Sequence, residues 1–145
     1  MREVLVIDAS VAVKWVVGEE GAARAVALRS GFDFAAPELI LPECANILWK
    51  KAQRGELARA EALLAARLLE RSGVDFVSLQ GLSETATQLA LDLRHPAYDC
   101  VYLALARRRG LRFVTADRRL LATVRERADA SLQALCVDLA AFSDA

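Results

Sequence analysis

The chain has 145 residues, with 19 Lys and Arg against 19 Asp and Glu, and 55% of its residues are hydrophobic. This balance excludes a wholly cationic protein and an acidic disordered chain, and the length fits one domain over residues 1–145. No run without Asp, Glu, Lys or Arg exceeds eight residues, the length of Phe76 to Ser83, which excludes a membrane-spanning helix. Three cysteines without a CxxC pair predict no disulfide framework or zinc knuckle, and they favour a reducing, cytoplasmic location.

Apolar runs typical of strands alternate with segments of helical spacing along the chain. In chain order, the prediction is strand 3–7, helix 11–17 with Ser10 as its N-cap, helix 19–30, strand 32–35, helix 37–54, helix 56–71, strand 74–79, helix 83–94 with Ser83 as its N-cap, helix 97–109, strand 111–115, helix 117–127, strand 131–137 and a final turn over 139–142. Gly55 separates the third and fourth helices, which predicts a helical hairpin. The alternation predicts a three-layer α/β/α fold around a mostly parallel sheet of about five strands.

Four acidic residues lie where such a sheet places its site. Asp8 ends the first strand and Asp117 follows the strand FVT by two residues, so both are expected at the carboxyl edge of the sheet. Glu43 and Asp99 lie near the starts of two apolar helices. Structural interpretations remain open for three of them: Asp117 as a helix N-cap, Asp99 as a complement to the helix dipole and Glu43 as an exposed helix residue.

The chemistry of these residues favours a divalent cation. Carboxylates that converge without cations repel one another, and a hard ion such as Mg²⁺ or Mn²⁺ removes that repulsion. Such ions activate water and stabilise phosphoryl charge without a nucleophilic Ser or Cys and without a catalytic His. The only histidine, His95, precedes Pro96 and is interpreted as a turn residue.

The segments around the four acids resemble the PIN domain, and specifically a VapC-type toxin ribonuclease of a type II toxin–antitoxin system. They are VIDASVAVKW around Asp8, PECANILWK around Glu43, HPAYDCVYLALA around Asp99 and FVTAD ending at Asp117. Together with the elements between them they span nearly the whole chain.

The resemblance implies a role for each matching residue. Asp8, Glu43 and Asp99 would form the catalytic and metal-binding carboxylate triad. Asp117 would be the fourth catalytic and metal-binding acid, acting through water. Small or polar residues would support the cluster by hydrogen bonding or by orienting an acid or a water: Ser10, Asn46 and Thr115.

The implied reaction is Mg²⁺- or Mn²⁺-dependent cleavage of an RNA phosphodiester by water, which leaves a 5′-phosphate and a 3′-hydroxyl. The resemblance also implies a transfer or ribosomal RNA target, a cognate antitoxin and a homodimer. The antitoxin surface would be the hairpin of residues 37–72, with Trp49 and the leucines of its second helix exposed. The alternative is that Trp49 and these leucines belong to the core.

Arginines are concentrated late in the chain, where eight of them lie within residues 107–127 against only Asp117 and Glu126. Candidate RNA-binding residues are Lys14, which lies six residues after Asp8, and Arg118 and Arg119, which follow Asp117. Lys50 and Lys51, at the end of the helix that carries Glu43, belong to the same basic rim. Such a basic rim can hold a phosphate backbone or an acidic part of an antitoxin. The alternative is an ordinary solvated helix face.

Two other functions share some of these features. A PIN-type RNA-processing nuclease without an antitoxin would carry the same acids. A non-catalytic, receiver-like signalling module also clusters acids at strand ends and uses a threonine such as Thr115. It requires a lysine at the end of its last strand, however, and no lysine follows Lys51.

Overall fold

The computed structural model describes residues 1–142, and its centre is a parallel five-stranded sheet. The strands are β1 (Val4–Ile7), β2 (Asp33–Pro37), β3 (Asp75–Val77), β4 (Phe113–Thr115) and β5 (Cys136–Asp138). Their order in the sheet is β3-β2-β1-β4-β5. The central strand β1 places Val6 opposite both Ala35 of β2 and Phe113 of β4. The predicted α/β fold with a parallel sheet is therefore confirmed.

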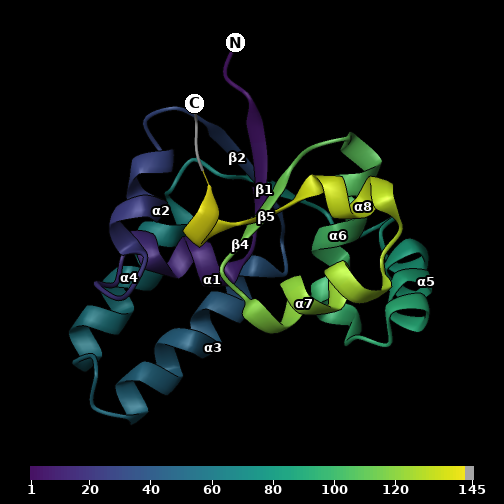
Figure 1. Cartoon of the computed structure of the whole chain (residues 1–145). Coiled ribbons are helices and arrows are strands. Elements are labelled where there is room, and N and C mark those ends of the chain that lie inside the picture. The colour runs from purple at the N-terminus through teal and green to yellow at the C-terminus, as the bar shows by residue number, and fades with distance from the viewer. Residues whose placement is uncertain (143–145) are drawn as a thin grey trace.

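Helices cover both faces of this sheet. They are α1 (Ala9–Ala12), α2 (Ala22–Leu28), α3 (Ile40–Gln53), α4 (Arg59–Glu70), α5 (Ser83–Leu93), α6 (Ala97–Arg109), α7 (Arg118–Arg127) and α8 (Ala130–Leu135), with 3₁₀ turns η1 (Val13–Trp15) and η2 (Leu139–Ala141). Figure 1 shows α5 and α6 on one side of the sheet and α1 and α2 on the other. Contacts of α6 with β1, β2 and β4, and of α1 with β1 and β4, join the layers.

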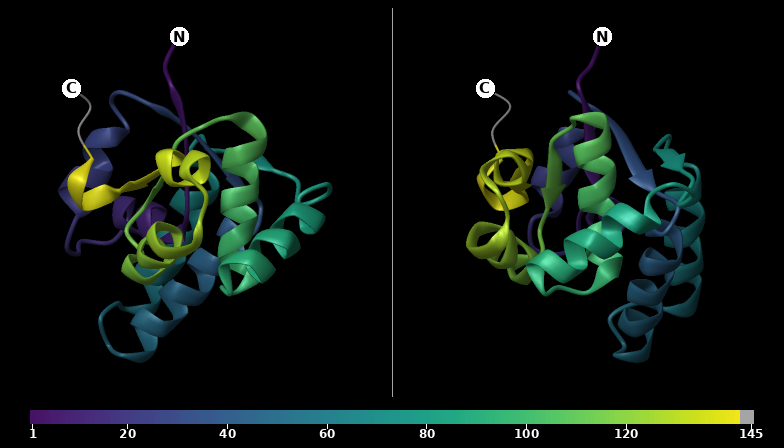
Figure 2. Two further views of the ribbon diagram at one scale, coloured as in Figure 1. Left: turned by 45° about the vertical axis from the view of Figure 1, so that its right-hand side comes forward. Right: turned by 90° about the vertical axis from the view of Figure 1, so that its right-hand side faces the viewer.

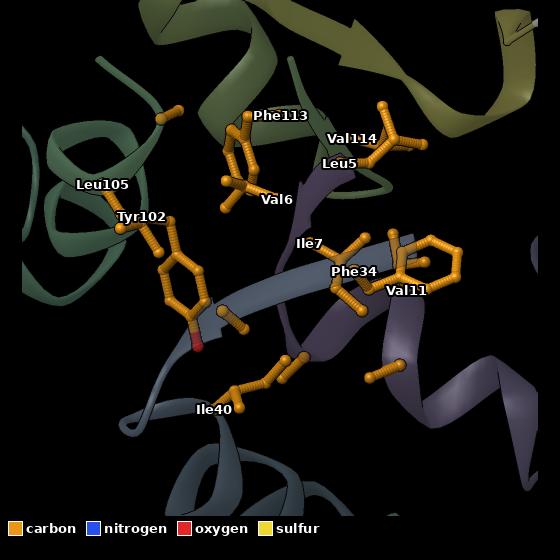
Figure 3. Packing of buried hydrophobic residues seen from close by; sticks show 14 of the residues in the cluster. Leu5, Val6, Ile7, Val11, Phe34, Ile40, Tyr102, Leu105, Phe113 and Val114 are labelled. Carbon is orange, nitrogen blue, oxygen red and sulfur yellow. The ribbon is translucent and has the colours of Figure 1, made fainter. Parts of the chain in front are cut away.

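The core consists of strand residues and the helix packed on them. The side chains from Leu5 to Ile7 are fully buried, as are those of β4. These continuous apolar runs suit strands covered by helices on both faces. Figure 3 shows Tyr102 and Leu105 of α6 packed near Val6 and Phe113, with the Tyr102 hydroxyl pointing toward Ile40 at the start of α3. Among residues 1–142, no helix combines the length and apolarity required to cross a membrane.

The prediction of a strand over residues 131–137 is wrong. Helix α8 covers most of this segment, and only Cys136–Asp138 pair with β4. The Asp129 carboxylate accepts a hydrogen bond from the backbone N–H of Leu132 at 2.8 Å, which caps the helix. A short uncharged run fits a strand or a helix equally well, and the N-cap decides between them here.

Two predicted N-caps are also wrong. The helix after β1 begins at Ala9 rather than at residue 11, with Asp8 in the N-cap position, and it continues as η1 only to Trp15. Ser10 lies inside that helix, and its hydroxyl donates to Asp8 instead of capping the helix. Ser83 likewise lies inside α5, with Leu82 in the N-cap position. In several other elements the observed ends differ from the predicted ends by one to three residues, whereas α6 has the predicted bounds.

Helices α3 and α4 form the predicted hairpin. Gly55 lies between them with a φ of 77°, a left-handed conformation that favours glycine. The right-hand view of Figure 2 shows the two helices side by side, extending away from the sheet. Trp49 is 57% exposed and Leu63 is 55% exposed, so these side chains lie on the surface rather than in the core.

Candidate active site

Four carboxylates from four separate segments lie near the carboxyl ends of the central strands. Asp8 directly follows β1 and Asp117 follows the neighbouring strand β4, while Glu43 and Asp99 lie in the first turns of α3 and α6. The negative charges of Asp117 and Asp99 both raise the pKa of Asp8, and the charge of Asp99 raises that of Glu43. Asp8 and Glu43 are therefore close enough to other acids of the cluster for their charges to interact.

Asp8 is the buried centre of this cluster. Its side chain is only 6% exposed, and burial raises its pKa from 3.8 to about 6 against the opposing effect of two hydroxyl donors. Ser10 donates to its Oδ1 at 2.6 Å and Thr115 donates to its Oδ2 at 2.5 Å. A buried carboxylate without a cationic partner is costly, and the hydrogen bonds offset only part of that cost.

The two hydroxyl groups also tie the cluster to the end of β4. The backbone N–H of Ala116 donates to the Ser10 hydroxyl at 2.9 Å, and the N–H of Asp117 donates to the Thr115 hydroxyl at 3.0 Å. Each hydroxyl thus accepts a backbone hydrogen bond and donates its own proton to the Asp8 carboxylate. This network fixes the orientation of Asp8 relative to the segment that carries Asp117.

Glu43 has a donor that the sequence analysis missed. The hydroxyl of Tyr102, a residue of α6 that is 1% exposed, donates to Glu43 Oε1 at 2.5 Å. Burial raises the pKa of Glu43, the hydrogen bond from Tyr102 lowers it, and the charge of Asp99 raises it. Burial and the neighbouring Glu43 also raise the pKa of Tyr102, which keeps its proton on the phenol oxygen.

Asp99 is held by the only histidine of the chain. His95 Nε2 lies 2.6 Å from Asp99 Oδ2, and His95 is 8% exposed. His95 precedes the helix as predicted, but its interpretation as only a turn residue is incomplete because its ring contacts a candidate site residue. The spacing of four residues before an acid in the first helical turn is the signal that could have identified this contact.

Asp117 lies at the N-terminus of α7, where one of its carboxylate oxygens accepts backbone hydrogen bonds. Asp117 caps α7, and a single oxygen, Oδ1, accepts from the N–H groups of Arg119 and Leu120 at 3.0 and 3.1 Å. Its other oxygen, Oδ2, accepts no hydrogen bond within residues 1–142.

Asn46 is exposed, and within residues 1–142 its side chain forms no hydrogen bond to any of the four acids. The geometry thus gives no support to an orienting role for Asn46.

The four acids form no ready-made metal cage. Within the described chain, no group of three or more His, Cys, Asp or Glu side chains is arranged to hold a metal ion directly. The donor set nevertheless suits a hard cation, because no Lys or Arg within residues 1–142 forms an ion pair with Asp8, Glu43 or Asp117. Mg²⁺ commonly binds through one or two carboxylates and several waters, which needs no cage of three ligands.

Two buried cysteines border the acids, and both are poor nucleophiles. Burial and the charges of Asp8 and Glu43 raise the pKa of Cys44 to about 12. Burial and the charge of Asp99 raise the pKa of Cys100 to about 11. Both thiols therefore keep their protons at neutral pH, and the reactive thiolate is absent there.

The basic residues near the acids are partly neutralised. Arg118 pairs with Asp138 at 3.0 Å, and Lys14 pairs with Glu19 at 3.6 Å. Arg119 is exposed and forms no ion pair within residues 1–142. Three other arginines of the basic stretch pair with acids elsewhere: Arg107 with Asp129, Arg109 with Asp75 and Arg112 with Glu3. The stretch from 107 to 127 is therefore less cationic as a surface than its composition suggests.

The chain is similar to several known proteins in sequence and in fold. The chain is 35% identical over 122 residues to Ribonuclease VapC3 of Pyrobaculum aerophilum, covering 80% of this chain and 91% of the relative. It is 32% identical over 116 residues to Ribonuclease VapC9 of Mycobacterium tuberculosis, covering 80% and 87%. The crystal structure of PAE2754 from Pyrobaculum aerophilum matches with a TM-score of 0.67 at 25% identity, covering 97% of this chain and 93% of that one.

A more distant structure, VapC20 of Mycobacterium tuberculosis, shares the fold with a TM-score of 0.64 at 17% identity, covering 97% of this chain and 98% of that one. Residues 5–126 match the PIN domain, a range that contains Asp8, Glu43, Asp99 and Asp117. This match excludes the receiver-like signalling module. The chain belongs to the PIN-domain family.

Proposed function

We propose that this protein is a VapC-type toxin that acts as a metal-dependent endoribonuclease and hydrolyses phosphodiester bonds of RNA. The observation that carries the proposal is the buried, hydroxyl-bonded Asp8, which lies among three further carboxylates and pairs with no Lys or Arg of residues 1–142. Curated relatives more than 30% identical are named VapC ribonucleases, which supports the same activity here.

Asp8, Glu43 and Asp99 are the proposed catalytic and metal-binding residues, with Asp117 contributing through water. Mg²⁺ or Mn²⁺ fits this all-oxygen donor set. When bound, such an ion supplies positive charge that stabilises the phosphoryl group and lowers the pKa of water. The position of Asp117 at the N-terminus of α7 leaves its Oδ2 available for a water.

The chain's own residues position the carboxylates. Tyr102 directs one oxygen of Glu43, and His95 directs one oxygen of Asp99. Ser10 and Thr115 each engage one oxygen of Asp8 through their hydroxyl protons, so both oxygens are oriented. These contacts leave the second oxygens of Glu43 and Asp99 for ligand or water, and the buried thiols stay out of the chemistry.

The hairpin of α3 and α4 is the proposed antitoxin surface. A groove of about 520 Å³ lies between the two helices, and its wall includes the exposed Trp49 and Leu63. An exposed apolar groove of this kind suits an amphipathic peptide segment. We further propose a homodimer, a cytoplasmic location and a transfer or ribosomal RNA target. Co-purification of a small partner protein would separate a toxin from a processing nuclease that has no antitoxin.

The experiment that tests the activity compares RNA cleavage by the wild type and by Asp8→Asn and Asp99→Asn in Mg²⁺ or Mn²⁺. Both variants should lose cleavage while circular dichroism shows a retained fold, and EDTA should abolish wild-type cleavage. Asp92→Asn, which changes an exposed acid on α5, is the matched control and should cleave normally. Undiminished cleavage in EDTA or by the Asp8→Asn protein would refute the proposed mechanism.

A further inference from the structure

A second groove lies directly beside the acids, between η1 and α3. Its volume is about 370 Å³, and its lining includes Ser10, Lys14, Glu19, Lys50, Lys51 and Arg54. Ser10 donates a hydrogen bond of 2.6 Å to Asp8, so the groove opens one hydrogen bond away from the buried carboxylate. Ala116, which precedes Asp117, also lines the groove. The groove therefore borders the candidate active site on the side of β1 and β4.

The lining of this groove is strongly cationic. Lys14, Lys50, Lys51 and Arg54 carry four positive charges, and Glu19 is the only acid of the lining. The Lys14 and Lys51 side chains are 15% and 12% exposed, and their ammonium groups converge on Glu19 at 3.6 and 3.0 Å. Glu56, outside the lining, pairs with Lys51 at 3.8 Å and with Arg54 at 3.4 Å. Lys50 is exposed and forms no ion pair within residues 1–142.

The cationic lining continues into an adjoining groove of about 390 Å³. The two grooves share Lys14 and Ala116, and the second one adds Arg24 and Arg118 to the lining. Its acids are Glu20 and Asp138, and Asp138 is the residue that pairs with Arg118. Cationic side chains thus line two neighbouring grooves that meet at Lys14 and Ala116. A single strand with regularly spaced negative charges fits this layout better than one isolated anion does.

We propose that the groove between η1 and α3 binds a phosphodiester of the RNA strand next to the bond that is cleaved, and that Glu19 competes with this phosphate for Lys14 and Lys51. This inference rests on the proposed function and names a binding site for its substrate. Two ammonium groups that converge on one carboxylate are equally suited to a phosphate oxygen, because lysine acts on both as a point charge. Removal of the Glu19 charge should therefore strengthen RNA binding, whereas removal of a lysine charge should weaken it.

Binding is measured with the full chain in EDTA, by fluorescence anisotropy of a labelled single-stranded RNA that is left uncut. Lys50→Gln should weaken binding roughly two- to five-fold, the size expected for one exposed charge contact. It should also reduce the salt dependence of the logarithm of affinity by about 0.7. Glu19→Gln should strengthen binding by a similar factor. Arg2→Gln removes the same charge from the opposite end of β1 and should leave affinity unchanged.

Lys50→Gln and Glu19→Gln are expected to change RNA affinity in opposite directions, so the two variants together test the inference. Because Lys50 loses no ion pair with any described residue, Lys50→Gln keeps the inference testable even if Glu19→Gln unfolds at a lower temperature. Unchanged RNA affinity for Lys50→Gln, or weaker binding for folded Glu19→Gln, would overturn the inference. If polyglutamate binding depends on Lys50 while RNA binding does not, the groove serves an acidic peptide and the RNA site is rejected. A wild type that cleaves no RNA in Mg²⁺ would instead reject the proposed function.

Discussion

Replacing Asp8 with Asn should stabilise the metal-free protein, although it should abolish activity. Burial, together with the charges of Asp117 and Asp99, raises the pKa of Asp8 from 3.8 to about 6. A raised pKa of an acid means that folding favours the protonated form. At about 1.4 kcal/mol per pKa unit, the ionised side chain therefore destabilises the folded state by about 3 kcal/mol above pH 6. This figure is an upper value for the gain, because the amide loses the charge-assisted hydrogen bonds from Ser10 and Thr115.

The pH dependence has a definite sign. Below pH 3.8 the Asp8 carboxyl is protonated in both the folded and the unfolded state, and it does not destabilise the fold. As pH rises from 3.8 through about 6, the wild type loses stability because the folded state has to ionise a buried carboxyl. The Asp8→Asn variant has no carboxyl at this position, so it does not lose this stability as pH rises. In EDTA at pH 8, we expect Asp8→Asn to be more stable than the wild type by roughly 1–3 kcal/mol. Each kcal/mol should raise the melting temperature by about 2–4 °C.

The assay is thermal unfolding followed by circular dichroism between pH 4 and pH 8, in EDTA and again in Mg²⁺. The stability difference between Asp8→Asn and the wild type should grow between pH 4 and pH 7, and Mg²⁺ should stabilise the wild type but not Asp8→Asn. Asp92→Asn, on an exposed face of α5, should show no such pH-dependent difference and should be stabilised by Mg²⁺ as the wild type is. An Asp8→Asn protein that melts several degrees below the wild type in EDTA at pH 8 would refute the reasoning, because Asp8 would then be a structural partner rather than an unfavourably buried charge.

Three further predictions concern the residues around the acids. Tyr102→Phe removes the donor to Glu43 and should lower RNA cleavage roughly 10- to 100-fold in single-turnover kinetics, with little change in RNA affinity. His95→Leu should reduce cleavage and weaken Mn²⁺ binding measured by calorimetry, whereas His95→Gln should restore part of both; equal defects would argue against positioning of Asp99 by the ring. Trp49→Ala should change stability by less than about 1 kcal/mol, because the side chain is 57% exposed, but it should reduce recovery of an antitoxin in pull-down experiments.

The sequence by itself determined the fold class and the four candidate acids. The apolar run of β1 and the acid that follows it are local features, and so are the alternation of strands and helices and the hairpin around Gly55. Each depends on neighbouring residues or on helical spacing, which a linear reading can assess. Helix α6 has the predicted bounds for this reason, since Pro96 precedes it and Gly110 ends it.

The tertiary structure decided the contacts that give the acids their properties. The Tyr102 hydroxyl meets Glu43 across 59 positions of the chain, and Thr115 meets Asp8 across 107. No local pattern encodes such pairs, because they depend on how α6 and β4 pack against the rest of the fold. The same holds for the exposure of Trp49, the burial that raises the pKa of Asp8 and the convergence of Lys14 and Lys51 on Glu19. Desolvation and long-range pairing arise only when distant segments exclude water together, so these properties became visible only in the folded chain.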